Sequence, residues 1–173
     1  VAAWLIWALE SWIGARGGWV FGAEAKLGVA VARGRKPDVS VYLPGRPLPA
    51  RHAGMSRRPP SVVVEILSPR PRDQRRDRVE KRQDYARFKV PYYWIVDPVI
   101  QLLEVFELTG DGRYAVALSA ADGKLSIPGC EGLVVDLDAL WKRMAALPAE
   151  GPAPRAPKAP GVKRARKQPR GRR

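Results

Sequence analysis

The chain has 173 residues, of which 46% are hydrophobic and six are Trp. This length and composition predict one globular domain with extensions, and they exclude a chain that is disordered throughout. The formal net charge of +14 favours a polyanionic partner. Nucleic acid is the first candidate, and an anionic membrane surface is the second.

Cys130 is the only cysteine and His52 is the only histidine. A single cysteine excludes an internal disulfide and a zinc site built from several cysteines, and it fits a cytoplasmic location. One histidine in a loop rich in Arg and Pro argues against Ser-His-Asp or Cys-His catalysis. The apolar residues 1–9 are too short to span a bilayer and lack the basic start of a signal peptide, so we expect no membrane partner. Because the chain begins with Val1 rather than Met, we expect its N-terminus to be truncated.

Helix and strand patterns alternate through the first part of the chain. Residues 1–16 carry Trp and Leu at helical spacing and are followed by a Gly pair, which predicts a helix. Short apolar runs predict four strands at residues 19–21, 27–32, 39–43 and 62–67. Residues 44–60 are rich in Pro, Gly and Arg, so we expect an irregular basic loop there.

The same alternation continues to residue 147. The run 62–67 has almost no polar residues, as is typical of a strand covered on both faces. The following segments predict a helix at 73–88, a buried strand from Val90, a hairpin formed by 101–108 and 113–118, and a strand followed by a helix within 133–147. This order predicts an α/β or α+β fold in which helices flank a mixed β-sheet.

Residues 148–173 have a different composition, because they consist mainly of Pro, Ala, Lys and Arg. From Glu150 onward there are nine Lys or Arg residues and one acid. Such a segment cannot bury enough apolar surface to offset the entropy that ordering would cost. We therefore predict a folded domain over residues 1–147 and a disordered basic tail over residues 148–173. The tail has no large apolar residue to insert, which makes a membrane-surface function the weakest alternative.

Two carboxylates are associated with neighbouring apolar strands. Asp38 heads the strand VSVY, and Glu65 lies inside VVVEIL. An ionised carboxylate in such surroundings costs several kcal/mol unless it is paired or binds a cation, and Mg²⁺ prefers oxygen ligands of this kind. The pattern therefore predicts a cation site at Asp38 and Glu65. On spacing alone, ordinary salt bridges with the many Arg side chains are the alternative.

Four segments together resemble a known family. In chain order, PDVSVY, VVVEILSP, Asp77-x-x-x-Lys81-x-x-x-Tyr85 and VPYYWIVDP are similar to the signatures of the Uma-two family of restriction-endonuclease-like proteins. This family is a branch of the PD-(D/E)XK nuclease-like superfamily, and the resemblance covers residues 4–141. It implies a restriction-endonuclease-like core. It also implies that Asp38 and Glu65 hold Mg²⁺ or Mn²⁺ and, together with Lys81, catalyse phosphodiester hydrolysis in DNA.

The chain departs from the family pattern at three places. The superfamily motif has Lys two residues after the Glu, where this chain has Leu67. As in its family, Lys81 on the next helix is expected to take the place of that lysine. The turn that precedes this helix is longer than is usual. Many relatives carry a further acid in additional N-terminal sequence, for which Glu10 or Glu24 would have to substitute.

Further residues are expected to support the site. Asp77 and Tyr85 lie four residues to either side of Lys81 on the predicted helix, so all three should line one wall. Six arginines close in sequence to the site are expected to hold the DNA backbone without reading bases. They are Arg57, Arg58, Arg70, Arg72, Arg75 and Arg76. The alternative for these six is a solvated, Arg-rich surface.

A competing interpretation is a binding module. In that case the nuclease fold has lost turnover and docks nucleic acid or a protein partner. Leu67 and the short N-terminus favour the module, whereas Asp38, Glu65 and Lys81 favour the endonuclease. A homodimer is left open by both interpretations.

Overall fold

The protein is described here from a computed structural model, which defines residues 1–51 and 54–147. The basic tail predicted for residues 148–173 lies outside the described residues. A six-stranded mixed sheet forms the centre, in the order β1-β4-β5-β6-β7-β8. Its strands are β1 (Trp19–Phe21), β4 (Val39–Tyr42), β5 (Val62–Ile66), β6 (Tyr92–Asp97), β7 (Leu102–Leu108) and β8 (Tyr114–Ala120). β5 and β6 run parallel and the other neighbours antiparallel, which confirms the predicted mixed sheet.

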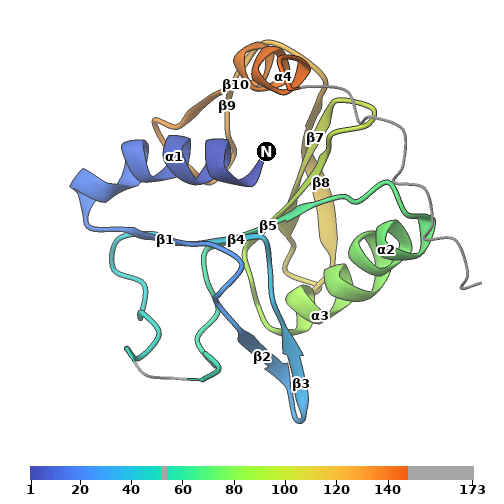
Figure 1. Cartoon of the computed structure of the whole chain (residues 1–173). Helices are drawn as coiled ribbons and strands as arrows, with labels where there is room; N and C mark the ends of the chain where they lie inside the picture. Colours follow the sequence, from blue (N-terminus) through green and yellow to red (C-terminus); the bar gives the residue numbers. More distant parts are fainter. Residues whose placement is uncertain (52–53, 148–173) are drawn as a thin grey trace, which may run out of the picture.

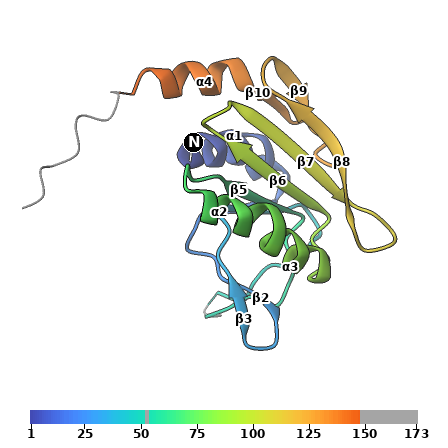
Figure 2. The same cartoon turned by 90° about the vertical axis from the view of Figure 1, so that its right-hand side faces the viewer.

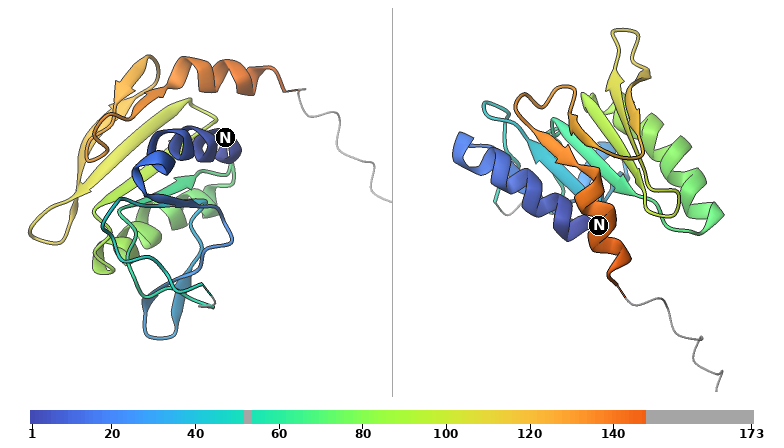
Figure 3. Two further views of the ribbon diagram at one scale, coloured as in Figure 1. Left: turned by 90° about the vertical axis from the view of Figure 1, so that its left-hand side faces the viewer. Right: turned by 90° about the horizontal axis from the view of Figure 1, so that it is seen from above.

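Helices lie on both faces of this sheet (Figure 1). The first face carries α1 (Ala2–Ile13), a 3₁₀ turn (Gly14–Arg16) and α4 (Leu137–Ala145). The second face carries one continuous helix made of α2 (Pro71–Arg75), the π-helical segment η2 (Arg76–Lys81) and α3 (Arg82–Arg87). Figure 3 shows α1 and α4 together on one side and this second helix on the other. Within residues 1–51 and 54–147, no helix reaches the length and apolar character needed to cross a membrane.

Two pairs of short strands complete the fold. β2 (Leu27–Ala30) and β3 (Arg33–Arg35) form a hairpin, which projects from the end of the molecule opposite α4 (Figure 2). β9 (Lys124–Ser126) pairs with β10 (Val134–Asp136) next to α4. The sequence pattern predicted β2 and β10 but missed β3 and β9. β3 reads Arg-Gly-Arg, a sequence without strand propensity.

Alternation along the strands divides the core between the two faces. Val62, Val64 and Trp94 pack with Leu5 and Leu9 of α1 in the larger cluster. The intervening residues project the other way, and a smaller cluster forms there with Tyr85 of α3. Since successive side chains of a strand point to opposite faces, Glu65 must lie on the α3 face. The fold therefore places this carboxylate under the second helix rather than in the larger core.

Candidate functional site

Asp38 and Glu65 lie opposite one another on adjacent strands. The β4–β5 register pairs Val39 with Val64, and continuing it by one residue on each strand pairs Asp38 with Glu65. Residues directly opposite in an antiparallel pair share one face of the sheet. Both carboxylates therefore face α3, at the end of β5 where the parallel strand β6 also ends.

A backbone hydrogen bond fixes Asp38 in this position. The Ile66 N–H donates to Asp38 Oδ2 at 2.7 Å. Asp38 is partly exposed, and among the described residues its second oxygen, Oδ1, accepts no hydrogen bond. One oxygen thus anchors Asp38 to β5, while the other stays available to a ligand.

Glu65 is 1% exposed, and both of its oxygens are bound. Lys81 Nζ donates to Oε2 at 2.7 Å, and the Tyr85 hydroxyl donates to Oε1 at 2.7 Å. Burial raises the pKa of Glu65 to about 7, even though Lys81 acts to lower it. Burial also acts to lower the pKa of Lys81, but Glu65 and Asp77 outweigh it and the net change is upward. Lys81 therefore keeps its charge beside a carboxylate that is costly to ionise.

Asp77 forms a second ion pair with Lys81. Lys81 Nζ lies 2.8 Å from Asp77 Oδ1, and the Tyr93 hydroxyl donates to the Asp77 carbonyl at 2.8 Å. Asp77 and Lys81 both belong to η2, which the sequence predicted only as ordinary helix. π-helical turns are rare in proteins, and those that occur often lie at functional sites. The structure thus brings Asp77, Lys81 and Tyr85 to one wall with Glu65.

A second group of charges beside this wall was missed from the sequence. Glu104 of β7 lies in register with Glu65 across β6, because Glu65 pairs with Ile95 and Ile95 pairs with Glu104. Arg78 of η2 binds Glu104, and its Nη2 lies 3.3 Å from Asp97 Oδ2. A spacing of three between Arg78 and Lys81 could have suggested two cations on one helix face. Nothing in the sequence assigned Glu104 as the partner of Arg78.

The other predicted residues occupy different places. Glu10 accepts a hydrogen bond from Val20 N–H, and Glu24 accepts one from Gly22 N–H. Both are exposed, and no contact within residues 1–51 and 54–147 joins either of them to Asp38 or Glu65. The structure therefore does not bring the expected upstream acids into the site.

The six predicted arginines remain at the surface but are not equivalent. All six are exposed, and five of them form no ion pair with another described residue, namely Arg57, Arg58, Arg70, Arg72 and Arg75. Arg76 is also accessible, but it forms ion pairs with Asp73 at 3.2 Å and Asp77 at 3.6 Å. Arg76 is thus partly neutralised by its own helix.

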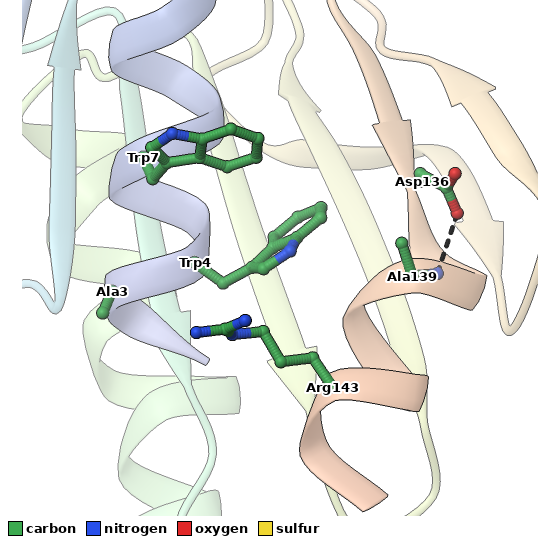
Figure 4. A pocket seen from close by; sticks show the side chains of 6 residues that line it. All are labelled: Ala3, Trp4, Trp7, Asp136, Ala139 and Arg143. Atoms are coloured by element: carbon green, nitrogen blue, oxygen red, sulfur yellow. Dashed lines mark hydrogen bonds between the residues drawn. The ribbon is translucent and has the colours of Figure 1, made fainter. Parts of the chain in front are cut away.

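A cavity lies on the opposite face of the sheet. It has a volume of about 610 Å³ and is lined by Ala3, Trp4, Trp7, Asp136, Ala139 and Arg143. Figure 4 shows the Trp4 and Trp7 rings of α1 facing α4 across it. Asp136 caps α4 by accepting a hydrogen bond from Ala139 N–H at 2.8 Å. This cavity shares no residue with the carboxylate site.

The donor set around Asp38 fits a hard divalent cation. Asp38 Oδ1, an oxygen of Glu65 and the Ile66 carbonyl are oxygen donors. The carbonyl should point towards Asp38, because N–H and C=O of one strand residue point to the same side. Among the described residues, no three His, Cys, Asp or Glu side chains group to hold a metal ion. Mg²⁺, however, commonly uses only one or two carboxylates and completes its shell with water.

Comparison with known proteins identifies the family. The family model Uma2, described as "Putative restriction endonuclease", matches residues 1–138. A solved structure from Anabaena variabilis, titled "a putative nuclease belonging to DUF820", is similar with a TM-score of 0.63. The two chains are 18% identical, and the similarity covers 82% of this chain and 78% of that one, so it shows the fold alone. The comparison with curated proteins found no match. The chain therefore belongs to the Uma2 family and has its restriction-endonuclease-like fold.

Proposed function

We propose that the protein is a metal-dependent endonuclease that hydrolyses phosphodiester bonds in DNA. One observation carries the proposal. Asp38 and Glu65 share one face at the meeting ends of β4 and β5, and Lys81 contacts Glu65 at 2.7 Å. This is the trio of side chains that the family resemblance implies for hydrolysis.

Asp38, Glu65 and the Ile66 carbonyl would hold Mg²⁺ or Mn²⁺. When bound, such an ion lowers the pKa of a coordinated water and stabilises charge on a phosphodiester oxygen. Lys81 would place its ammonium beside the reacting phosphate, where it offsets negative charge that develops in the transition state. Asp77 would keep this ammonium oriented, because it forms an ion pair with Lys81 in addition to that of Glu65.

The DNA backbone would lie along α2. Arg70, Arg72 and Arg75 are exposed at the start of the helix that carries Lys81. Guanidinium groups bind phosphate oxygens through paired hydrogen bonds and add no base preference. Arg76 would contribute less, because Asp73 and Asp77 already engage it.

A binding module remains the second candidate, and two observations favour it. Leu67 occupies the position of the superfamily lysine and is buried in the apolar cluster of the α3 face. Both oxygens of Glu65 are bound to protein donors. A protein that docks DNA without cutting it would need no lysine at position 67. It would also need no Glu65 oxygen available to bind a metal ion.

Cleavage of supercoiled plasmid distinguishes the two candidates. The endonuclease should nick or linearise the plasmid in Mg²⁺ or Mn²⁺ and should be inactive in EDTA. Asp38→Asn should abolish cleavage, because it removes a charge needed to hold the ion while keeping the shape of the side chain. Plasmid that is bound but never cut, with any of these ions, would establish the binding module instead.

A further inference from the structure

The hairpin β2–β3 is a second element next to the site, and the proposed function does not yet use it. Only Lys36 and Pro37 separate β3 from Asp38. The hairpin projects away from the sheet and its covering helices (Figures 1 and 2). A substrate bound at Asp38 would therefore extend past this hairpin.

Ion pairs along β3 tie the hairpin to α3. Arg33 Nη1 lies 2.9 Å from Asp84 Oδ1, and Arg35 Nη2 lies 2.6 Å from Asp84 Oδ2. Asp84 is 3% exposed and precedes Tyr85, whose hydroxyl binds Glu65. A buried carboxylate of α3 thus clamps β3 next to the residue that supports the site.

A neighbouring segment adds further support. Gly28 N–H donates to the Ser56 carbonyl at 2.7 Å, and Ser56 N–H donates to the Lys26 carbonyl at 2.7 Å. Gly28 and Gly34 pair across the hairpin, and a Cβ atom at Gly34 would lie 3.2 Å from Met55 Sδ. The two glycines therefore leave room for Met55 to pack against the ribbon.

The tip of the hairpin has features that packing does not explain. Val31 is 91% exposed. Among the described residues, no other large apolar side chain at the surface is as exposed. Ala32 follows it with φ of 56°, a left-handed conformation that costs a residue with a Cβ roughly 1–2 kcal/mol. The tight turn between β2 and β3 accounts for the conformation of Ala32, whereas no packing against the fold accounts for the exposure of Val31.

Positive charge lies along the hairpin, from Lys26, Arg35 and Lys36 at its base to Arg33 next to its tip. Residues 25–37 contain Lys26, Arg33, Arg35 and Lys36 and no acid. Lys26 and Lys36 are exposed, and the Arg33 side chain is 53% exposed although it contacts Asp84. The exposed Arg57 runs alongside, since its Cγ would lie 3.6 Å from a Cβ at Gly28. Cations on the flanks and an apolar tip match the phosphates and the interior of a DNA groove.

We propose that the β2–β3 hairpin enters the major groove of duplex DNA, with Val31 against base edges and Lys26 and Lys36 on the flanking phosphates. The major groove is about 12 Å wide and admits a two-stranded ribbon, and an apolar side chain there can contact the thymine methyl group. The hairpin would thus position the duplex for cleavage at Asp38 and Glu65. This inference rests on the proposed DNA function, but it concerns binding and not turnover.

Fluorescence anisotropy of a labelled duplex in EDTA tests the hairpin without cleavage. Val31→Asp should weaken binding by at least about tenfold, the scale of a lost base contact. The matched control is Val134→Asp, which alters a valine that is 55% exposed on β10, and it should bind like the parent. Methyl green, which occupies the major groove, should compete with the protein, whereas the minor-groove ligand netropsin should not.

A second variant keeps the test independent of the tip. Lys26→Met with Lys36→Met should reduce the slope of log affinity against log salt by about two, one for each lost phosphate contact. Equal affinity of Val31→Asp, Val134→Asp and the parent would overturn the proposal, as would competition by netropsin alone. Binding that follows these expectations in a protein that never cuts DNA would refute the endonuclease and leave the hairpin inference standing.

Discussion

The two faces of the central sheet are built from the same strands, yet they differ in chemistry. Under α1, the side chains Val39, Val62, Val64 and Trp94 form an uninterrupted apolar core. Under α2 and α3, the sheet carries Asp38, Glu65 and Glu104, with Lys81 and Arg78 of η2 above them. Burying charged groups costs free energy that a well-packed apolar pair would not. The α1 face is therefore apolar throughout its core, whereas the α3 face combines an apolar cluster with buried charged groups that only a function would justify under the proposal above.

The largest expected effect concerns stability on the α1 face. Leu9 is 1% exposed in that core, so Leu9→Ala should lower the free energy of unfolding by about 2–5 kcal/mol. Urea denaturation followed by circular dichroism measures this change. DNA cleavage per folded molecule should stay unchanged at a temperature where the variant is folded. A loss of cleavage in fully folded Leu9→Ala would break the division between the two faces.

The next effect concerns turnover on the α3 face. Lys81→Met removes the ammonium beside Glu65 but keeps much of its stem, so cleavage should fall by about two or more orders of magnitude. Lys142→Met, the same change at an exposed position of α4, serves as the control. Binding of Mn²⁺ and DNA should change little in either variant. Parental cleavage by Lys81→Met would show that this lysine only balances the charges of Glu65 and Asp77.

The smallest effect compares two consecutive residues of β4. Ser40 is fully buried, and its hydroxyl has no hydrogen-bond partner among the described residues. Ser40→Ala should therefore leave the unfolding free energy unchanged or raise it by up to about 1 kcal/mol. Val41 points into the α1 core, and Val41→Ala should be destabilising. Thermal melts of the two variants test the difference, and a Ser40→Ala protein less stable than Val41→Ala would contradict it.

The pattern of the sequence was sufficient to predict the main features of the fold and which side chains of the candidate site lie together. Continuous apolar runs predicted β5 and β6, and a carboxylate inside such a run drew attention to Glu65. Intervals of four placed Asp77, Lys81 and Tyr85 on one wall. These predictions succeeded because strand and helix periods are local properties of the chain.

Features that depend on partners distant in the chain could not be predicted in this way. Glu104 lies between Leu103 and Val105 in β7, a local pattern that is also typical of a solvent-facing strand residue. Its contact with Arg78 arises only when η2 crosses the sheet. The contacts of Arg33 and Arg35 with Asp84 arise likewise when the hairpin folds onto α3. The expected support from Glu10 and Glu24 failed for a similar reason, since each accepts a local backbone hydrogen bond instead.

The central claim is that Asp38 and Glu65 together hold a divalent cation, and calorimetric titration with Mn²⁺ tests it most directly. The parent protein should show one saturable site. Asp38→Ala should lose that site while keeping the circular dichroism and thermal melt of a folded protein. Unchanged Mn²⁺ binding by Asp38→Ala, or no saturable binding by the parent, would contradict the assignment of these two carboxylates.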